Sequence, residues 1–536
     1  MRRLAGSMKA RLATLALIAL GYVALGVSRG LSIYDEGIPV LGASRILEGD
    51  RPYRDFWSVY APGQFYALAG LFKVFGTSLL VSRLASVAAI AGTAVLVYAL
   101  ARRLRLPTGL AVFATALWTV AVGAIAGATL SVGMFTALTL AFGSALGFLR
   151  FLQEPHRGWL AVSGAAMGLA CVVRHDIGGC LLLAEATMLV GAMDWRTPGG
   201  AHRGLVSLEL YLGAVVVPVA GATAILVGLG VPPGDLVDDL VVYPLTGYRA
   251  GRALPLPALL PDLAPLQAGR ISLGQYAASV RTGLRFYFPV VVLVLTASVL
   301  ACRRRLPSAG GAQAVVFVWL LALALLPYAW VRSDIAHIVP AWGPALLLLA
   351  WLIHQMPASG PWRAAGLALA VAWSAVFVWG AVVTKVDALA ALIPGRPGLG
   401  LDGPRGAHIT VGPEMASMQA AIRYVQAVVP RDERIFVGNA HHDSLVLNDV
   451  MFYFLAGRRS ATKYHELVPG VATTAAVQRA IVQDLERHRV RHLVLRADPG
   501  YVRNPAGATI LDQFIRERFE EVEEFGRYGV WRRREG

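Results

Sequence analysis

An apolar run at residues 12–28, LATLALIALGYVALGVS, is followed directly by RGLSIYDEG at residues 29–37. The run is long enough to cross the hydrocarbon core of a membrane. Basic residues precede it (Arg2, Arg3, Lys9 and Arg11), and the acidic pair Asp35 and Glu36 follows it. Because Lys and Arg favour the cytoplasmic side, we expect the helix to run outward and to place this pair at the outer surface. No small-residue cleavage site follows cleanly, which favours an uncleaved first helix over a signal peptide.

Similar apolar runs recur along the first 384 residues. They predict about eleven membrane spans, near 12–28, 78–100, 108–127, 129–149, 159–173, 177–193, 205–230, 286–302, 313–331, 340–355 and 363–384. Composition agrees, because 56% of the chain is hydrophobic and only 15% is charged. Of the 33 acidic residues, 18 follow Lys385, so 33 − 18 = 15 remain for the first 384 residues. That is too few for an ordinary soluble surface.

The charged residues of the loops separate into two sets. The basic set contains Arg2, Arg3, Lys9, Arg11, Arg102, Arg103, Arg105, Arg150, Arg157, Arg196, Arg203, Arg303, Arg304, Arg305 and Arg363. The acidic set contains Asp35, Glu36, Glu48, Asp50, Asp55, Asp235, Asp238, Asp239, Asp262 and Asp334. The basic loops predict the cytoplasmic side, and an odd number of spans then places the C-terminal part outside the cytoplasm. The same bias explains the net charge of +16, so we expect no nucleic-acid partner.

The C-terminal part has a different composition. We divide the chain into a membrane domain (1–384), a Pro- and Gly-rich linker (385–413) and a soluble domain (414–536). In the last part, helices are predicted at 415–428, 475–489 and 509–519, and strands at 434–438, 492–496 and 529–532. The expected fold is therefore mainly α, a polytopic membrane helix bundle with an extracytoplasmic α/β domain.

The first outer loop has the densest polar pattern. It contains Tyr34-Asp35-Glu36-Gly37, then Gly49-Asp50-Arg51-Pro52-Tyr53-Arg54-Asp55, then Tyr60-Ala61-Pro62. A carboxylate at the outer end of a helix can accept a proton from a hydroxyl group or hold a metal. A solvated loop acid or a helix cap is the structural alternative.

These motifs, with Phe75-Gly76 and Arg83 downstream, resemble the first loop of the protein O-mannosyltransferase and aminoarabinose-transferase superfamily of GT-C glycosyltransferases, the bacterial family 39 type. The resemblance implies a polyprenyl-phosphate sugar donor and inversion at the anomeric carbon. It also implies that Asp35 is the catalytic acid/base residue with Glu36 as its partner. Some members use a divalent cation such as Mg²⁺ or Mn²⁺, and others do not. Pro62-Gly63 departs from the Pro-Pro or Pro-Leu of many bacterial members, and no motif identifies the sugar or the acceptor.

Two charged turns at the outer ends of predicted spans are candidates for binding the donor phosphate. One is Arg174-His175-Asp176, and the other runs from Arg332 to His337. Charges at such positions are usually paired or functional. We expect Arg174, Arg332 and His337 to bind phosphate, and Arg174 and Arg332 to line one pocket with Asp35. A structural Arg–Asp pair and interfacial anchoring are the alternatives.

Further residues are expected to contact substrate. They are Arg54, Tyr60, Asp176, His441 and His442. Adjacent side chains rarely close one metal site, so His441 and His442 favour substrate contact or a polar loop over a metal.

Together, these features predict a cell-envelope glycosyltransferase of the cell membrane. Its partners would be a polyprenyl-phosphate sugar and a glycan, lipid or protein acceptor. The alternatives are a transporter or flippase of lipid-linked saccharides, and a non-catalytic envelope scaffold. A transporter should carry charges near mid-membrane, but the predicted spans carry few there, with Glu185 the main one. Charges cluster instead at the outer ends of the spans, which favours chemistry at the membrane surface.

Overall fold

A computed structural model of the chain describes residues 2–125, 132–193, 198–302, 309–357, 359–390, 398–444, 448–498 and 501–535. Each of the eleven expected spans coincides with a helix or helix pair. These are α1 (Arg2–Ala24), α4 (Leu79–Arg103), α5 (Thr108–Ile125), α6 (Val132–Gln153), α7 (Arg157–Val173), α8 (His175–Gly191), α9 (Pro198–Gly228), α14 (Leu273–Cys302), α15 (Ala309–Ala324) with α16 (Leu326–Val331), α17 (Ile335–Gln355) and α18 (Pro361–Ala390).

Seven helices among the described residues are long and apolar enough to cross a membrane by length and composition. They are α4, α6, α9, α14, the α15–α16 stretch, α17 and α18. The chain is therefore a multi-pass membrane protein. Of the basic loop residues, Arg196 and Arg303 to Arg305 lie outside the described residues, as does Asp194.

Helix α17 lies at the centre of the bundle, and all its residues from Ile338 to Leu352 are buried. Trp342 donates its indole N–H to the carbonyl of Arg285 on α14 (3.2 Å) and packs edge-on against Phe377 of α18 (4.9 Å between ring centroids). A large aromatic side chain at such a crossing buries much apolar area and satisfies its one polar group. These contacts fix α14 and α18 against the centre.

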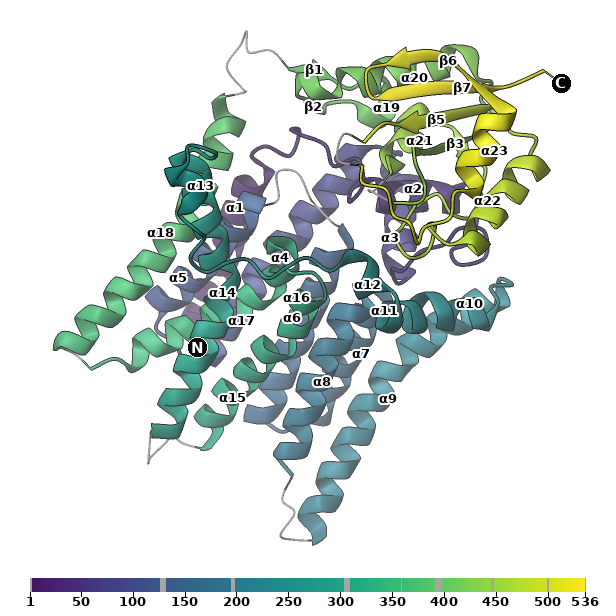
Figure 1. The fold of residues 1–536 in the computed structure, drawn as a ribbon. Helices are drawn as coiled ribbons and strands as arrows, with labels where there is room; N and C mark the ends of the chain where they lie inside the picture. The colour runs from purple at the N-terminus through teal and green to yellow at the C-terminus, as the bar shows by residue number, and fades with distance from the viewer. Residues whose placement is uncertain are drawn as a thin grey trace.

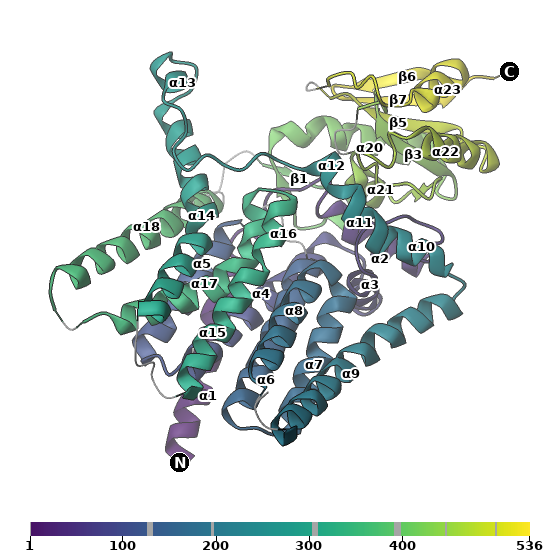
Figure 2. The same cartoon turned by 60° about the horizontal axis from the view of Figure 1, so that its bottom comes forward.

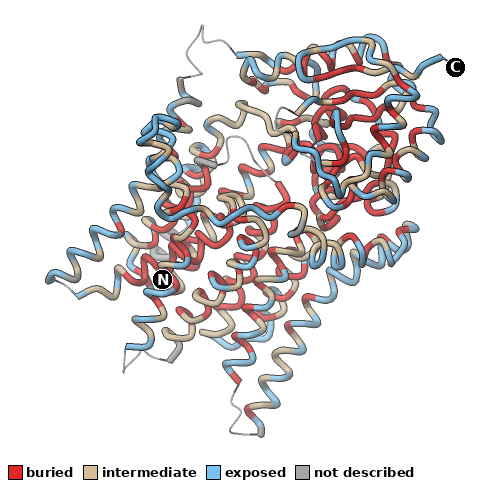
Figure 3. Tube along the Cα trace, in the orientation of Figure 1, coloured by how far each residue is buried: buried red, intermediate tan, exposed pale blue. Residues whose placement is uncertain are grey.

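The periphery of the bundle is apolar but uncovered. Helix α9 exposes Val216 and Val217, the latter with 72% of its surface accessible to solvent. Helix α18 exposes Val371 and Trp379. Figure 3 shows long exposed stretches on both helices. An apolar surface of this extent on a soluble protein would promote aggregation, whereas in a membrane it faces lipid.

A layer of short helices covers the end of the bundle that carries the C-terminal domain (Figure 1). It consists of α2 (Gly37–Leu47), α3 (Gly63–Phe75), α10 (Pro233–Val237), the π-helix η1 (Asp238–Val242), α11 (Tyr243–Thr246) and α12 (Tyr248–Arg252). Helix α13 (Ala264–Gln267) lies apart from them, beyond one end of α14 (Figure 2). The N-terminus lies at the opposite end (Figure 2). The acidic loops and the C-terminal domain are therefore on the same end of the molecule.

The C-terminal domain is built on a five-stranded mixed sheet. Its elements are β1 (Leu399–Gly400), α19 (Gly403–Gly406), β2 (Thr410–Val411), η2 (Pro413–Met415), α20 (Ala416–Val428), β3 (Arg434–Asn439), α21 (Val450–Ala456), β4 (Arg459–Ser460), α22 (Ala475–Arg487), β5 (His492–Arg496), α23 (Ile510–Arg518), β6 (Phe519–Phe525) and β7 (Tyr528–Arg533). The order is β4-β3-β5-β7-β6, with β3 parallel to β4 and β5, and β7 antiparallel to β5 and β6.

The three predicted strands are found as β3, β5 and β7, but β6 was not expected. Its sequence, FEEVEEF, contains four glutamates, which are poor strand formers. The strand lies at the edge of the sheet and carries a register shift between Glu521 and Glu523. Charges and irregularities of this kind protect an edge from pairing with another chain.

The C-terminal domain shares a hydrophobic core with the first outer loop. Tyr34, Ile38 and Phe72 belong to the same buried cluster as Ile422 and Phe454. At the closest approach, a Cβ at Gly37 would lie 2.7 Å from the backbone N of Met451, so only glycine fits there. Part of the expected linker joins this contact, because Thr410 exchanges backbone hydrogen bonds with Ser28 and Gly30. Residues 391–397 of that linker lie outside the described residues.

The common placement of the acidic loops and the C-terminal domain predicts the outcome of a topology experiment. A reporter that is active only outside the cytoplasm, such as alkaline phosphatase, should be active when fused after Gly536. The same reporter fused after Arg103 should be silent, because that loop belongs to the basic set. The reverse pattern would place Asp35 in the cytoplasm and contradict the predicted orientation.

Candidate active site

Asp35 lies in the short segment between α1 and α2, with its side chain exposed while both its neighbours are buried. Tyr34 is 3% exposed and Glu36 is 4% exposed. The backbone N–H of Asp35 donates to the hydroxyl of Ser32 (3.1 Å). The buried neighbours anchor the segment on both sides, so the backbone at Asp35 is held in place while its carboxylate is exposed.

Glu36 is held by Arg83 at the start of α4. The guanidinium donates to both carboxylate oxygens, at 2.7 and 2.8 Å, and both side chains are almost fully buried. Arg83 also donates to the carbonyl oxygens of Val27, Arg29 and Gly30 (2.8–3.2 Å). Glu36 does not line the pocket that Asp35 faces. Glu36, the expected catalytic partner of Asp35, therefore forms a structural ion pair with Arg83. This pair fixes the backbone next to Asp35.

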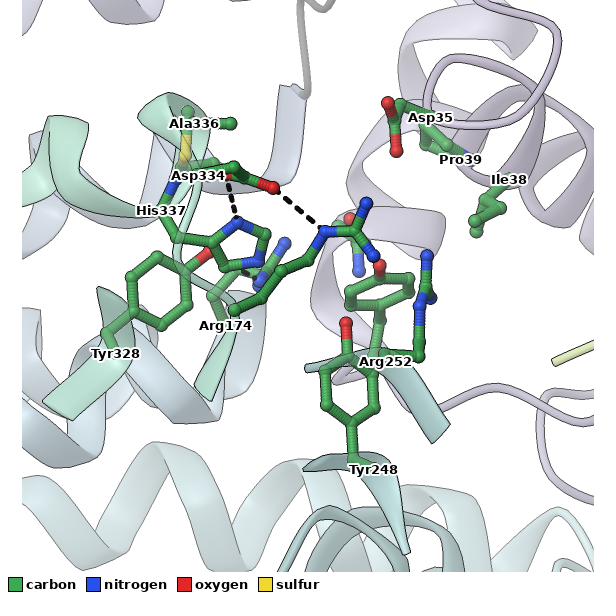
Figure 4. A pocket seen from close by; sticks show the side chains of 14 residues that line it. Asp35, Ile38, Pro39, Arg174, Tyr248, Arg252, Tyr328, Asp334, Ala336 and His337 are labelled. Atoms are coloured by element: carbon green, nitrogen blue, oxygen red, sulfur yellow. Dashed lines mark hydrogen bonds and ion pairs between the residues drawn. The ribbon is translucent and has the colours of Figure 1, made fainter. Parts of the chain in front are cut away.

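A cavity of about 130 Å³ brings together half of the predicted site residues. Its walls contain Asp35, Tyr60, Arg174, Arg332 and His337. Figure 4 shows Asp35 and Pro39 on one side of this pocket and Asp334, Ala336 and His337 on the other. Asp35, Arg174 and Arg332 thus line one pocket, as expected from their positions at the outer ends of spans.

Arg174 interrupts the α7–α8 hairpin in an extended conformation (φ −149°, ψ 93°). Its guanidinium binds the Asp176 carboxylate through two hydrogen bonds (3.0 and 2.6 Å) and donates to the Tyr328 hydroxyl (3.1 Å). It also lies over the Tyr60 ring, 4.7 Å from the centroid. Asp176 and Tyr60 therefore orient Arg174 at the pocket wall.

The turn before α17 holds the second predicted cation. Arg332 donates to Asp334 (2.8 Å), and Asp334 also caps α17 by accepting the backbone N–H of His337 (3.0 Å) and pairs with its ring Nδ1 (2.7 Å). Burial alone would raise the pKa of Asp334, but the hydrogen bonds from His337 and Arg332 lower it to about 2. Asp334 is thus ionised at neutral pH and fixes Arg332 and His337.

Arg252 is a third cation in the pocket, and it was not predicted from the sequence. It is 7% exposed, donates to the Tyr34 hydroxyl (3.2 Å), and lies near the rings of Tyr34 and Tyr248 (5.2 and 5.4 Å). Among the described residues, no carboxylate lies within ion-pair distance of Arg252, in contrast to Arg174 and Arg332. The only signal in the sequence was the aromatic-basic pattern Tyr248-Arg249-Ala250-Gly251-Arg252 in a segment that reads as irregular.

A second, more apolar cavity of about 420 Å³ adjoins the pocket. The two share Tyr60, Arg174, Tyr248, Tyr328 and His337. Beyond these, the second cavity is lined mainly by apolar side chains of η1, α11, α8 and α16, including Leu240, Val241, Pro244, Leu245, Cys180, Pro327 and Val331. A polar head and an apolar chain of one ligand could therefore occupy the two cavities together.

Three predicted substrate contacts lie elsewhere. Arg54 pairs with its neighbour Asp55 at the surface (2.8 Å) and lines a separate groove. His442 is fully buried in the C-terminal domain and binds Asp512 (2.6 Å), whereas His441 is exposed and stacks on Tyr501 (4.0 Å between centroids). None of them lines the pocket with Asp35.

The structure adds a non-adjacent partner to the histidine motif. His441, Asp443 and Asp512 can each bring one ligand atom to within 4.8 Å of the others, so they could hold a divalent cation such as Mg²⁺ or Mn²⁺ in the C-terminal domain. The pocket itself is different. Asp334 already binds Arg332 and His337, which leaves Asp35 facing three guanidinium groups. These residues do not make a site for a divalent cation.

Solved structures of two glycosyltransferases have the same fold. ArnT from Cupriavidus metallidurans in the apo state matches with a TM-score of 0.58 and 14% sequence identity, over 98% of both chains. ArnT bound to undecaprenyl phosphate matches with a TM-score of 0.55 and 13% identity, over 97% of both chains. The arabinofuranosyltransferase AftD from Mycobacteria matches with a TM-score of 0.50 and 14% identity, over 98% of this chain and 40% of that one.

The family comparison agrees with the fold. The model of the dolichyl-phosphate-mannose-protein mannosyltransferase family matches residues 59–219, a range that includes Tyr60, Arg83 and Arg174. A search of curated proteins finds no match. The architecture is that of a membrane helix bundle with a polar pocket beneath an α/β domain. The chain therefore has the fold of these membrane glycosyltransferases, and its residues 59–219 resemble the mannosyltransferase family.

The Glu36–Arg83 pair predicts a test of stability. Glu36→Ala leaves a buried guanidinium without its counter-charge, which should destabilise the protein by about 3–5 kcal/mol. Arg54→Ala removes an exposed ion pair and should change stability by no more than about 0.5 kcal/mol. Thermal unfolding in detergent would measure both. Equal melting temperatures for Glu36→Ala and Arg54→Ala would show that the Glu36–Arg83 pair is not a structural anchor.

Proposed function

We propose that the protein transfers a sugar from a polyprenyl-phosphate donor to a hydroxyl group of an acceptor, on the extracytoplasmic side of the membrane. One observation carries the proposal: a single free carboxylate, Asp35, faces three arginines in a pocket that adjoins an apolar cavity. A base opposite a cluster of cations suits a reaction in which a hydroxyl loses a proton and a phosphate leaves.

In this proposal, the oxygen of the acceptor hydroxyl attacks the anomeric carbon of the sugar while Asp35 accepts the hydroxyl proton. The bond from that carbon to the donor phosphate breaks, and the phosphate leaves with an additional negative charge. Arg174, Arg252 and Arg332 stabilise that charge, and they are already oriented before the donor binds. Attack from the side opposite the phosphate inverts the configuration of the sugar.

Arg252 has a distinct role among the three arginines. Asp176 and Asp334 already neutralise Arg174 and Arg332, respectively. Arg252 has no directly paired carboxylate in the part of the chain that the structure describes, and it lies at the wall of the pocket. We therefore expect Arg252 to contribute most to binding of the phosphate.

The apolar cavity would receive the first isoprenoid units of the donor. Its residues are continuous with the phosphate pocket through Tyr248 and Tyr328. The related fold of ArnT has been observed with undecaprenyl phosphate bound, which supports a polyprenyl-phosphate ligand here. A transfer site at the membrane surface requires that the lipid chain stays in an apolar environment while the phosphate meets charged groups.

A transporter or flippase is less well supported. The mid-bundle carboxylate, Glu185, is fully buried and accepts hydrogen bonds from Ser144, Ser163 and Tyr211 (2.6–3.1 Å). A carboxylate with so many bonds joins α6, α7, α8 and α9 and does not line either cavity described above. The charges that do line cavities gather at one end of the bundle.

Asp35→Asn tests the general base. The substitution preserves the size of the side chain but removes its negative charge, so the fold should be retained. Turnover should fall by at least ~100-fold, the usual effect of losing a general base. Turnover would be measured as the release of polyprenyl phosphate when the purified protein is supplied with a mixture of polyprenyl-phosphate sugars.

The matched control is Asp238→Asn, which changes an exposed acid on the same face that lines neither cavity. Its release rate should equal that of the wild type. A well-folded Asp35→Asn protein with wild-type release would refute the role of Asp35 and favour the transporter hypothesis.

Arg252 substitutions test the phosphate pocket. Arg252→Ala should raise the KM for the donor by ~10- to 100-fold, because a charge-assisted hydrogen bond to phosphate is lost. Arg252→Lys should recover part of the loss, since lysine keeps the charge but not the forked geometry. If Arg252→Ala leaves the donor KM unchanged while Arg174→Ala raises it, the phosphate is bound by the paired arginines instead.

A further inference from the structure

Glu466 is a buried carboxylate of the C-terminal domain that lies against the first outer loop. It is 0% exposed. Its Oε1 accepts a hydrogen bond from the Tyr34 hydroxyl (2.7 Å), and its Oε2 has no hydrogen-bond partner among the described residues. An ionised carboxylate without a counter-charge is costly to bury, so a nearby cation is expected.

That cation is Arg252, one hydroxyl group away. The Tyr34 hydroxyl donates to Glu466 and accepts a hydrogen bond from Arg252 (3.2 Å). Arg252 has no ion-paired carboxylate among the described residues, so Glu466 supplies its counter-charge through Tyr34. The chain Glu466–Tyr34–Arg252 thus joins the C-terminal domain to the wall of the reaction pocket.

The same chain reaches Asp35 by the backbone. Tyr34 immediately precedes Asp35 and is fixed by Glu466 on one side, as Glu36 is fixed by Arg83 on the other. On the C-terminal domain, Asn448 clamps both neighbours of Glu466: its amide donates to the carbonyl of His465 (2.8 Å), and its oxygen accepts the N–H of Leu467 (3.0 Å). Glu466 is therefore rigidly presented to the loop.

We propose that Glu466 is a positioning residue through which the docked C-terminal domain orients Arg252 and Asp35 and so completes the pocket. This inference rests on the proposed transfer reaction. It assigns a role to the C-terminal domain that does not require the domain to touch the donor.

The ionisation of Glu466 should then appear in the pH dependence. Burial raises the pKa of Glu466 to about 7, although the hydrogen bond from Tyr34 and the charge of Arg252 act in the opposite direction. The charged and titratable groups that face it are Tyr34, Asp35, Tyr60, Tyr243 and Arg252, with His465 adjacent in sequence. A carboxyl group with a raised pKa is ionised above that pKa, so the orienting charge is present above about pH 7 and is lost as the pH falls through it.

The test compares wild type, Glu466→Gln and Tyr34→Phe in the full-length protein. Glu466→Gln keeps the size of the side chain and can still accept the tyrosine hydrogen bond, but it has no charge. We expect the donor KM at pH 8 to rise by at least ~10-fold in Glu466→Gln. The acid limb near pH 7 in wild-type kcat/KM should disappear. Tyr34→Phe, which removes the hydroxyl between Glu466 and Arg252, should also raise the donor KM but should retain an acid limb, because Glu466 can still titrate.

Glu433→Gln is the control, because Glu433 is a largely buried acid of the same domain that pairs with Arg491 and His492 and not with the pocket. It should keep the wild-type KM and pH profile. A purely structural role for Glu466 would lower the melting temperature and leave both unchanged, and that result would overturn the inference.

A binding measurement separates this inference from the proposed function. The Kd of undecaprenyl phosphate, measured by quenching of tryptophan fluorescence, should rise by at least ~10-fold in Glu466→Gln and stay unchanged in Glu433→Gln. If the wild type binds the lipid phosphate but turns over no sugar donor, the proposed transfer reaction is refuted. The positioning role of Glu466 is then still tested by the difference in Kd between wild type and Glu466→Gln. Equal Kd values for wild type and Glu466→Gln would overturn the positioning role even if transfer is observed.

Discussion

The buried ion pair between Arg83 and Glu36 is the constraint on which the position of the pocket depends. Arg83 binds three backbone carbonyls in the segment that leaves α1, and it holds the carboxylate at the start of α2. One side chain therefore sets the path of the chain from the first helix into the outer layer. Because Asp35 lies between Glu36 and Tyr34, its backbone has little freedom. The pair places an exposed carboxylate at a defined point, which a loop alone would not do.

The electrostatics of the pocket follow from which arginines are already paired. Asp176 and Asp334 hold Arg174 and Arg332 in fixed orientations, so these two contribute shape as well as charge. The counter-charge of Arg252 is Glu466, and the Tyr34 hydroxyl bridges the two side chains. An anion entering the pocket meets preorganised donors instead of flexible side chains, and little reorganisation accompanies its binding. In the proposed reaction, the adjoining apolar cavity would accommodate the lipid chain attached to this anion.

The C-terminal domain is tied to the segment that carries Asp35 because its core continues into the first outer loop. Gly37 packs directly on the backbone of Met451, and Phe72 of α3 stacks on Phe454 of α21 (6.2 Å between centroids). Backbone hydrogen bonds from Thr410 to the segment after α1 add a second contact. Displacing the domain would expose this shared apolar surface and would remove Glu466 from Tyr34. The first outer loop and the C-terminal domain therefore share one hydrophobic core.

The sequence by itself predicted the helix bundle, the α/β character of the C-terminal domain and a pocket shared by Asp35, Arg174 and Arg332. Long apolar runs, strand periodicity and charges at helix ends are local patterns, and local patterns survive in a linear sequence. Only the tertiary structure decided that Glu36 pairs with Arg83, that Arg252 enters the pocket, and that Glu466 and Asp512 join distant partners. Tyr34 and Glu466 are 432 positions apart, and no periodicity relates them. An acid or a base in a sequence carries its charge, but the fold alone determines which opposite charge it meets.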